Sequence, residues 1–150
     1  MNRRTELIGL MVLAADIALS AGQSSPRTPA PVGIRTVEKG DMSFADSLLQ
    51  VVARTDTEWA AVWGQHAANR PVPPIDFSRE MVVGIFLGSR PTAGHRVEIV
   101  ATRVEQAALV VEYRETRPGR GDVTAQVVTS PYHLVALPTH PGTVRFDKVV

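Results

Sequence analysis

Short runs of Val, Ile and Leu alternate with Gly- and Pro-rich turns from Ile75 onward, and this pattern most constrains the fold. Residues 81–87 are apolar or glycine throughout, which is typical of a strand covered on both faces. Residues 96–105 instead place Val97, Ile99 and Ala101 on one side, as in a half-buried strand. Runs of this length separated by turn residues predict strands rather than helices.

The same signals predict about seven or eight strands in all. The predicted strands are residues 32–37, 48–53, 81–87, 96–105, 109–114, 123–128, 133–137 and 144–149. A tight turn is expected at Glu105-Gln106. Residues 48–53 are also compatible with a helix, but a helix start follows at once and favours a strand.

One helix is predicted between the second and third strands. Thr55 and Glu58 have the spacing of a capping box, in which each residue satisfies a free backbone N–H of the first turn. The apolar stripe that follows consists of Trp59, Val62, Trp63 and His66. The helix is expected over roughly Asp56–Ala67, and the Pro-rich residues 71–74 end it.

The predicted fold is mainly β: a small β-sandwich or half-open barrel with one packed α-helix, with an α+β arrangement as the alternative. Aromatic residues make up 5% of the chain, so Val, Ile and Leu must supply most of the core. Residues 32–150 are expected to form one domain, because more than a hundred residues can bury a core without disulfides or metals.

The first 31 residues have a different character. Arg3 and Arg4 precede a short apolar stretch and then small residues, which predicts a signal peptide over residues 1–22. An uncleaved membrane anchor and a cytosolic amphipathic segment are the alternatives. Residues 23–31 are rich in Ser, Pro and Thr and are expected to be a linker. The mature protein is therefore expected outside the cytoplasm, secreted or periplasmic, with no membrane span.

Motifs of known catalytic chemistry are missing from the sequence. There is no cysteine, and the four histidines form no His-x-His or His-x-x-x-His pair, so no metal site is expected. Ser130 and His133 lie close together, but no Gly-x-Ser-x-Gly elbow surrounds the serine. We expect no catalytic residues and no cofactor. The net charge of +1 with interspersed signs also argues against nucleic acid as a partner.

Three loops between apolar strands have unusual composition: residues 91–95, 118–122 and 129–133. A rigid β scaffold that presents loops is a common way to build a binding edge. Tyr132 and His133, beside a proline, are expected to act as a stiff aromatic anchor there. The candidate partner-binding residues are Arg90, Pro91, Thr92, Gly94, His95, Arg120, Ser130, Pro131, Tyr132 and His133. Ordinary loop chemistry is the alternative explanation for the same residues.

Four motifs, in order, resemble one known family. They are Trp59-x-x-x-Trp63, the segment 75–83, the loop Gly88-x-Arg90-Pro91-Thr92-x-Gly94, and the segment 129–133. Together they resemble the C-terminal domain of the protease complex subunit PrcB, from about Thr55 to Phe146. The resemblance implies a non-catalytic, exported subunit that associates with a secreted protease and stabilises it. Ala93 and His95 depart from the family's usual Pro-Thr-Gly-Gly-Tyr loop.

Two alternatives remain. The order of the three loops is also similar to that of the chagasin-like cysteine-protease inhibitors, although their Arg-Pro-Trp and Gly-x-Gly-Gly motifs are absent. A chain of this kind would inhibit a protease with three loops at one end of the sandwich. The other alternative is an envelope structural module with no enzymatic role.

Overall fold

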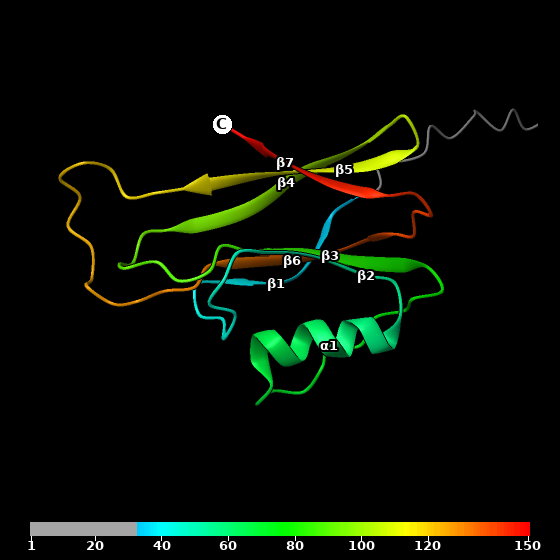
Figure 1. Ribbon diagram of the computed structural model, residues 1–150, viewed down its shortest axis with the longest axis horizontal. Coiled ribbons are helices and arrows are strands. Elements are labelled where there is room, and N and C mark those ends of the chain that lie inside the picture. Colours follow the sequence, from blue (N-terminus) through cyan, green and yellow to red (C-terminus); the bar gives the residue numbers. More distant parts are fainter. Residues whose placement is uncertain (1–32) are drawn as a thin grey trace, which may run out of the picture.

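The computed structural model describes residues 33–150, and these residues form two stacked sheets with one helix (Figure 1). The predicted signal peptide and linker lie outside the described residues. The mainly β prediction is confirmed, with seven strands in two sheets and no closed barrel. No described helix has the length and apolar character needed to cross a membrane.

The first sheet has four antiparallel strands in the order β1-β6-β3-β2: β1 (Arg35–Gly40), β6 (Tyr132–Pro138), β3 (Glu80–Phe86) and β2 (Leu49–Ala53). The second has three in the order β4-β5-β7: β4 (Arg96–Glu105), β5 (Ala108–Thr116) and β7 (Val144–Val149). β4 and β5 form an antiparallel hairpin, whereas β5 and β7 are parallel.

β3 and β6 lie at the centre of the first sheet and are buried on both faces. Met81, Val83 and Ile85 point into the core between the sheets, whereas Val82 and Phe86 pack against α1 (Asp56–Ala67). Figure 1 shows the helix across the outer face of this sheet. This two-sided burial explains why residues 81–87 are apolar without alternation.

The helix begins and ends where the sequence predicts. Thr55 Oγ1 accepts a hydrogen bond from the backbone N–H of Glu58 at 3.1 Å. The Glu58 carboxylate accepts from the N–H of Arg54 at 2.7 Å, one residue before the position that a standard capping box uses. Trp59 and Trp63 are buried, and their indole N–H groups donate to carbonyls of Pro73 and Arg70.

Residues 123–128 do not form a strand, which corrects the prediction. Val123 is fully exposed, and Val127 and Val128 are more than half exposed. These residues belong to the long connection between β5 and β6 and have no adjacent strand with which to pair. The tight turn of the β4–β5 hairpin is at Gln106-Ala107, both with positive φ, one residue later than expected.

Candidate functional site

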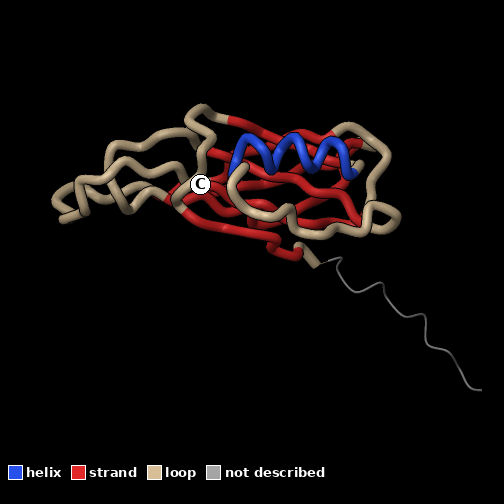
Figure 2. Tube along the Cα trace, turned by 90° about the horizontal axis from the view of Figure 1, so that it is seen from below, coloured by secondary structure: helices blue, strands red, loops and turns tan. Residues whose placement is uncertain are grey.

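Three connections meet at one end of the sandwich. They are residues 41–48 between β1 and β2, residues 87–95 between β3 and β4, and residues 117–131 between β5 and β6. We name this region the loop end. The two later connections project beyond the sheets at the left of Figures 1 and 2. Two long irregular connections thus lie together at the loop end.

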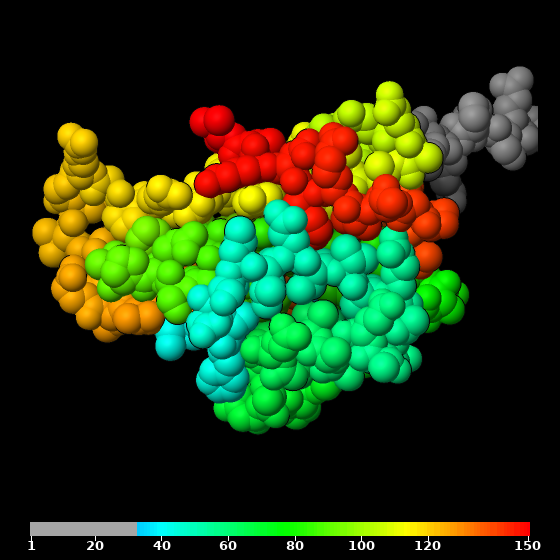
Figure 3. All heavy atoms as spheres, viewed as in Figure 1, coloured from blue at the N-terminus to red at the C-terminus, as the bar shows by residue number. Residues whose placement is uncertain are grey.

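The projecting connections are held together by main-chain hydrogen bonds. Arg90 and Thr129 exchange a pair, at 2.7 and 2.9 Å, and the N–H of Ala93 donates to the carbonyl of Ala125 at 3.0 Å. The Thr129 hydroxyl also donates to the carbonyl of Thr92. We name residues 88–95 and 117–129 the arm; Figure 3 shows it in green, yellow and orange at the left. These bonds give the arm a defined shape.

The arm is fastened to the 41–48 connection at its base. The N–H groups of Ser89 and Ser130 donate to the carbonyls of Asp46 and Asp41, at 3.0 and 2.7 Å. Gly88 has φ +79°, and a Cβ there would lie 2.8 Å from the Asp46 carbonyl oxygen. Only glycine allows both that conformation and that approach. The three connections therefore share one base.

Glu115, at the end of β5, gathers three cations around the base of the arm. Its nearly buried carboxylate lies 3.3 Å from Arg90, 3.1 Å from Arg117 and 2.6 Å from Lys148. Burial alone would raise the pKa of Glu115, but the hydrogen bonds from Lys148, Arg117 and Arg90 outweigh it and hold the pKa at about 2. The carboxylate is therefore ionised at neutral pH and ties both halves of the arm to β7.

Exposed apolar side chains are concentrated at the loop end. Of nine large apolar residues that are exposed in the described chain, six lie on its connections: Met42, Phe44, Leu48, Val123, Val127 and Val128. Phe44 is 65% exposed and borders two shallow pockets beside the C-terminal end of α1. Exposed apolar groups gathered on one region are typical of a surface that contacts another protein.

Six of the ten predicted binding residues belong to the arm or its junction with β4. Pro91, Gly94 and Arg120 are exposed, whereas Arg90, Thr92 and His95 are half-buried. Arg90 contributes to the structure of the arm, since it pairs with Glu115 and donates to the carbonyl of Leu87. Whether these residues bind a partner stays a prediction.

The other four residues, Ser130, Pro131, Tyr132 and His133, do not form an exposed loop. All four are buried, and β6 begins at Tyr132. The Ser130 hydroxyl donates to the carbonyl of Ala45. The expectation of a third loop at 129–133 is therefore wrong, because these residues return the arm to the centre of the first sheet and hydrogen-bond to the 41–48 connection.

Tyr132 is a core residue and not a surface anchor. Its ring stacks on Phe86 with centroids 5.9 Å apart, and it lies 4.2 Å from the ring of His66. Burial, together with the neighbouring Glu38 carboxylate, raises the pKa of Tyr132 to about 12. The phenol is thus protonated throughout the physiological range.

His133 connects the two sheets. Its Nδ1 accepts a hydrogen bond from the backbone N–H of Ile99 on β4 at 2.8 Å, so Nε2 carries the proton and donates to Thr36 Oγ1 on β1 at 2.9 Å. Burial lowers the pKa of His133 to about 4, and the charge of Lys39 acts in the same direction. The imidazole is therefore neutral at pH 7.

Ser43, His66 and Glu38 form a hydrogen-bonded series. His66 Nδ1 lies 2.8 Å from Ser43 Oγ, and His66 Nε2 lies 2.7 Å from a Glu38 oxygen. The order of groups is that of a nucleophile, a base and an orienting acid, with the two ring nitrogens exchanged. Ser43 Oγ, however, also accepts from the N–H of Ala45, and the His66 side chain is fully buried.

Arg70 further separates this series from a catalytic triad. It pairs with the Glu38 carboxylate, and this contact, with help from His66, holds the pKa of Glu38 at about 2 against burial. Burial lowers the pKa of His66, and the carboxylate that would stabilise its charged form is already neutralised by Arg70. These contacts indicate a structural role for the series, which connects β1, the 41–48 connection and α1.

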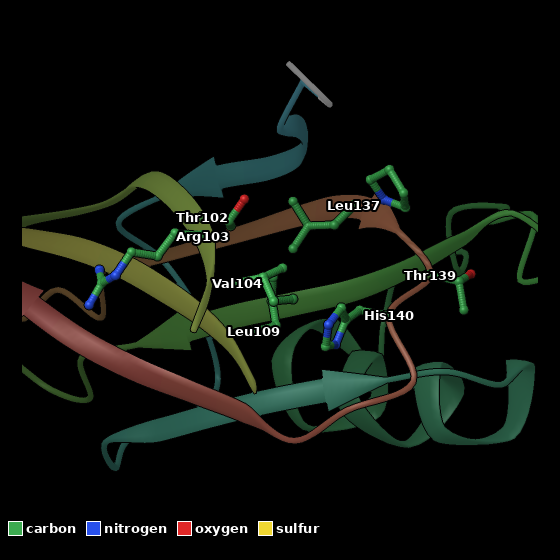
Figure 4. Close-up of a pocket in the computed structure, with 8 residues that line it drawn as sticks. Thr102, Arg103, Val104, Leu109, Leu137, Thr139 and His140 are labelled. Atoms are coloured by element: carbon green, nitrogen blue, oxygen red, sulfur yellow. The ribbon is translucent and has the colours of Figure 1, made fainter. Parts of the chain in front are cut away.

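A separate pocket opens between the sheets at the opposite end of the sandwich (Figure 4). Its volume is about 370 Å³, and its walls are Thr102, Arg103, Val104, Leu109, Leu137, Pro138, Thr139 and His140. His140 Nδ1 accepts from the N–H of Gly142, so its ring is fixed within the turn before β7.

No cluster of three or more metal-ligating side chains occurs among residues 33–150.

The 41–48 connection is the part of the loop end that sequence reasoning missed. It has no strand periodicity, yet it carries Met42, Phe44 and Leu48, all more than half exposed. Large apolar residues within a non-periodic polar segment were the available signal. Their exposure, and their position beside the arm, required the structure.

The fold and these connections define a two-sheet β domain that presents a preformed set of loops at one end. A family model described as PrcB C-terminal matches residues 81–138. The match extends from β3 through β4, β5 and the β5–β6 connection to the last residue of β6. It confirms the resemblance to the PrcB family over these residues. No curated protein and no solved structure matches the chain.

Proposed function

We propose that this chain is a non-catalytic, exported binding module that serves as an accessory subunit of an extracytoplasmic protease and docks through the loop end. The family match supports a role in a protease complex. The main support for the loop end as the docking surface is its exposed apolar side chains. It has six of the nine large apolar residues that are exposed in the described chain.

The arm suits protein recognition because it is already ordered. Main-chain bonds between residues 90 and 129, and between 93 and 125, fix its shape, and the Glu115 ion pairs fix its base. A preformed loop loses little conformational entropy when it binds, so more of the contact energy contributes to affinity. Phe44 and Met42 add large apolar groups near the same base, and a few large side chains commonly contribute most of the binding energy of an interface.

The proposed role is non-catalytic because the Ser43, His66 and Glu38 series offers no accessible base. The His66 side chain is fully buried, and the Glu38 carboxylate forms an ion pair with Arg70. The domain would act by occupying a surface of the protease. A subunit of this kind stabilises the protease by mass action, since it binds the folded form and not the unfolded one.

The proposal is tested by affinity capture of the tagged chain from the extracytoplasmic fraction, followed by mass spectrometry. Val127→Asp on the arm is compared with Val104→Asp at the opposite end, since these valines are 53% and 64% exposed. We expect a protease to be enriched by the unchanged chain and by Val104→Asp but not by Val127→Asp. Equal enrichment by all three proteins, or enrichment of no protease, would contradict the proposal.

The captured protease is then assayed with and without the domain. A longer active lifetime supports the accessory role. An immediate, dose-dependent loss of protease activity would instead indicate that the chain is an inhibitor. Three connections at one end of a sandwich are also compatible with that function. Phe44→Ser should weaken either effect, since Phe44 is exposed on the 41–48 connection.

A further inference from the structure

We propose that the pocket between the end of β1 and the start of β4 binds the C-terminal carboxylate of an extended polypeptide. The pocket has a volume of about 460 Å³ and is lined by Lys39, Gly40, Asp41, Ala93, Gly94, His95, Arg96 and Val97. It lies beside the arm, at the loop end. The inference rests on the proposed function only in taking a polypeptide as the ligand.

The pocket forms where the two sheets separate. β1 and β4 are joined by the ion pair between Lys39 and Glu98, at 3.3 Å, and by His133, which bridges Thr36 and Ile99. Beyond these contacts β1 ends at Gly40, while the chain before β4 turns into the arm. The space between them is therefore bounded by one strand end and one strand start.

The charged groups on the pocket walls favour an anion. Lys39 and Arg96 contribute two positive charges, and Asp41 is the one acidic residue of the lining. Arg96 makes no ion pair with another described residue, so its guanidinium is available for a two-point contact with a carboxylate. Lys39 is paired with Glu98, but both side chains are more than a third exposed, so this pair is weak and can rearrange.

His95 differs from the other three histidines. The rings of His66, His133 and His140 each hydrogen-bond to the protein, whereas His95 makes no such bond among residues 33–150. Its Nδ1 is also sealed from solvent without a partner. A buried ring nitrogen without a partner is unfavourable, and a ligand that lets the ring reorient would remove that cost. The imidazole becomes a third contact for the ligand when its ring turns Nδ1 towards the pocket.

The backbone of β4 indicates that the anion belongs to an extended polypeptide. The N–H of Ile99 points away from β5, because it donates to His133. Strand alternation directs the N–H of Val97 to the same side, at the outer edge of β4 and on the pocket wall. An extended peptide can pair with such an edge while its terminal carboxylate reaches Arg96.

The inference is tested by titrating the ¹⁵N-labelled chain with three short peptides and recording amide NMR spectra. The peptides are acetyl-Ala-Ala-Ala with a free carboxylate, the same peptide as a C-terminal amide, and acetyl-Ala-Glu-Ala amide. We expect saturable shifts at residues 39–41 and 94–98 with the free carboxylate, and about tenfold weaker binding of the amide. Equal binding of the first two peptides would overturn the inference. Preference for the internal glutamate would overturn the assignment to a terminus.

Two variants complete the test. Arg96→Gln should weaken the free-carboxylate peptide about tenfold, because it removes a charged two-point donor. Arg120→Gln is the control, since Arg120 is an exposed arginine of the arm outside the pocket lining. An unchanged affinity in Arg96→Gln would contradict the proposal. If the chain captures a protease but does not bind the peptides, the proposed accessory role is retained and only the assignment of the pocket is contradicted.

Discussion

Tyr132 and His133 follow a proline, and proline next to an aromatic residue favours a loop when only local sequence is considered. Their burial arises from contacts that are distant in sequence. Tyr132 packs against Phe86 and His66, and His133 binds Thr36 and Ile99. The residue types were therefore recognised as important, but their role as core and as inter-sheet ties depends on which strands become neighbours.

At the residue scale we expect Tyr132→Ala to destabilise the fold by about 3–5 kcal/mol, because it empties a buried aromatic site. Tyr132→Phe keeps the ring and removes only the hydroxyl, so it should cost less, about 1 kcal/mol. Chemical denaturation of the three proteins measures both differences. If Tyr132→Ala left the midpoint unchanged, the ring would have to lie at the surface after all.

At the scale of elements, the local sequence was sufficient to predict an element that is stabilised by contacts within its own residues. The capping residue Thr55 and the stripe from Trp59 to His66 predicted the helix with its observed bounds, Asp56–Ala67. The same reasoning failed for residues 123–128, whose β-branched residues favour a strand. A strand also needs a partner, and the adjacent residues 88–95 contain Gly88, Pro91 and Gly94 and contribute only one main-chain bond there.

The helix cap gives the prediction at this scale. Thr55→Ala should destabilise the fold by about 1 kcal/mol, because the N–H of Glu58 loses its acceptor. Thr57→Ala is the matched control, since Thr57 is exposed in the first turn and should change stability by less than about 0.5 kcal/mol. Thermal or denaturant unfolding distinguishes the two. Equal effects of both substitutions would show that the cap does not stabilise the helix.

At the scale of the whole molecule, the two sheets are held together by an apolar core and by one buried histidine near the loop end. The general architecture could be predicted from strand spacing and from the single helix. The strand order could not, because β1 pairs with β6 and β5 pairs in parallel with β7 across long stretches of sequence. The position of the loop end follows from that order, which is why the 41–48 connection was not anticipated.

His133 predicts how the stability of the molecule depends on pH. Its pKa is about 4 in the fold, below the ordinary value of 6.5, so its contribution is complete above about pH 6.5 and is lost as the pH falls towards 4. The loss amounts to about 3 kcal/mol. The carboxylates Glu38 and Glu115, each with a pKa of about 2, lose their contribution only between about pH 4.5 and 2.

His133→Asn separates these two ranges. Asparagine can accept the Ile99 N–H but does not titrate, so the decline in unfolding free energy between pH 6.5 and 4.5 should be smaller in the variant. The contribution of His66, whose pKa burial also lowers, should remain, as should the decline at lower pH. Denaturant unfolding at several pH values measures both. The same slope in the variant and the unchanged protein above pH 4.5 would contradict the assignment to His133.

The pairing of β1 with β6 has a consequence for the order of folding. Arg35 is opposite Ala136, so the outermost strand of the first sheet meets its partner only after about a hundred further residues have been synthesised. Until then β2, β3 and α1 can associate among themselves, but β6, the strand with which β1 pairs, is not yet present. Long-range closure of this kind slows folding. The sheet would therefore be completed late, after nearly the whole chain has left the ribosome.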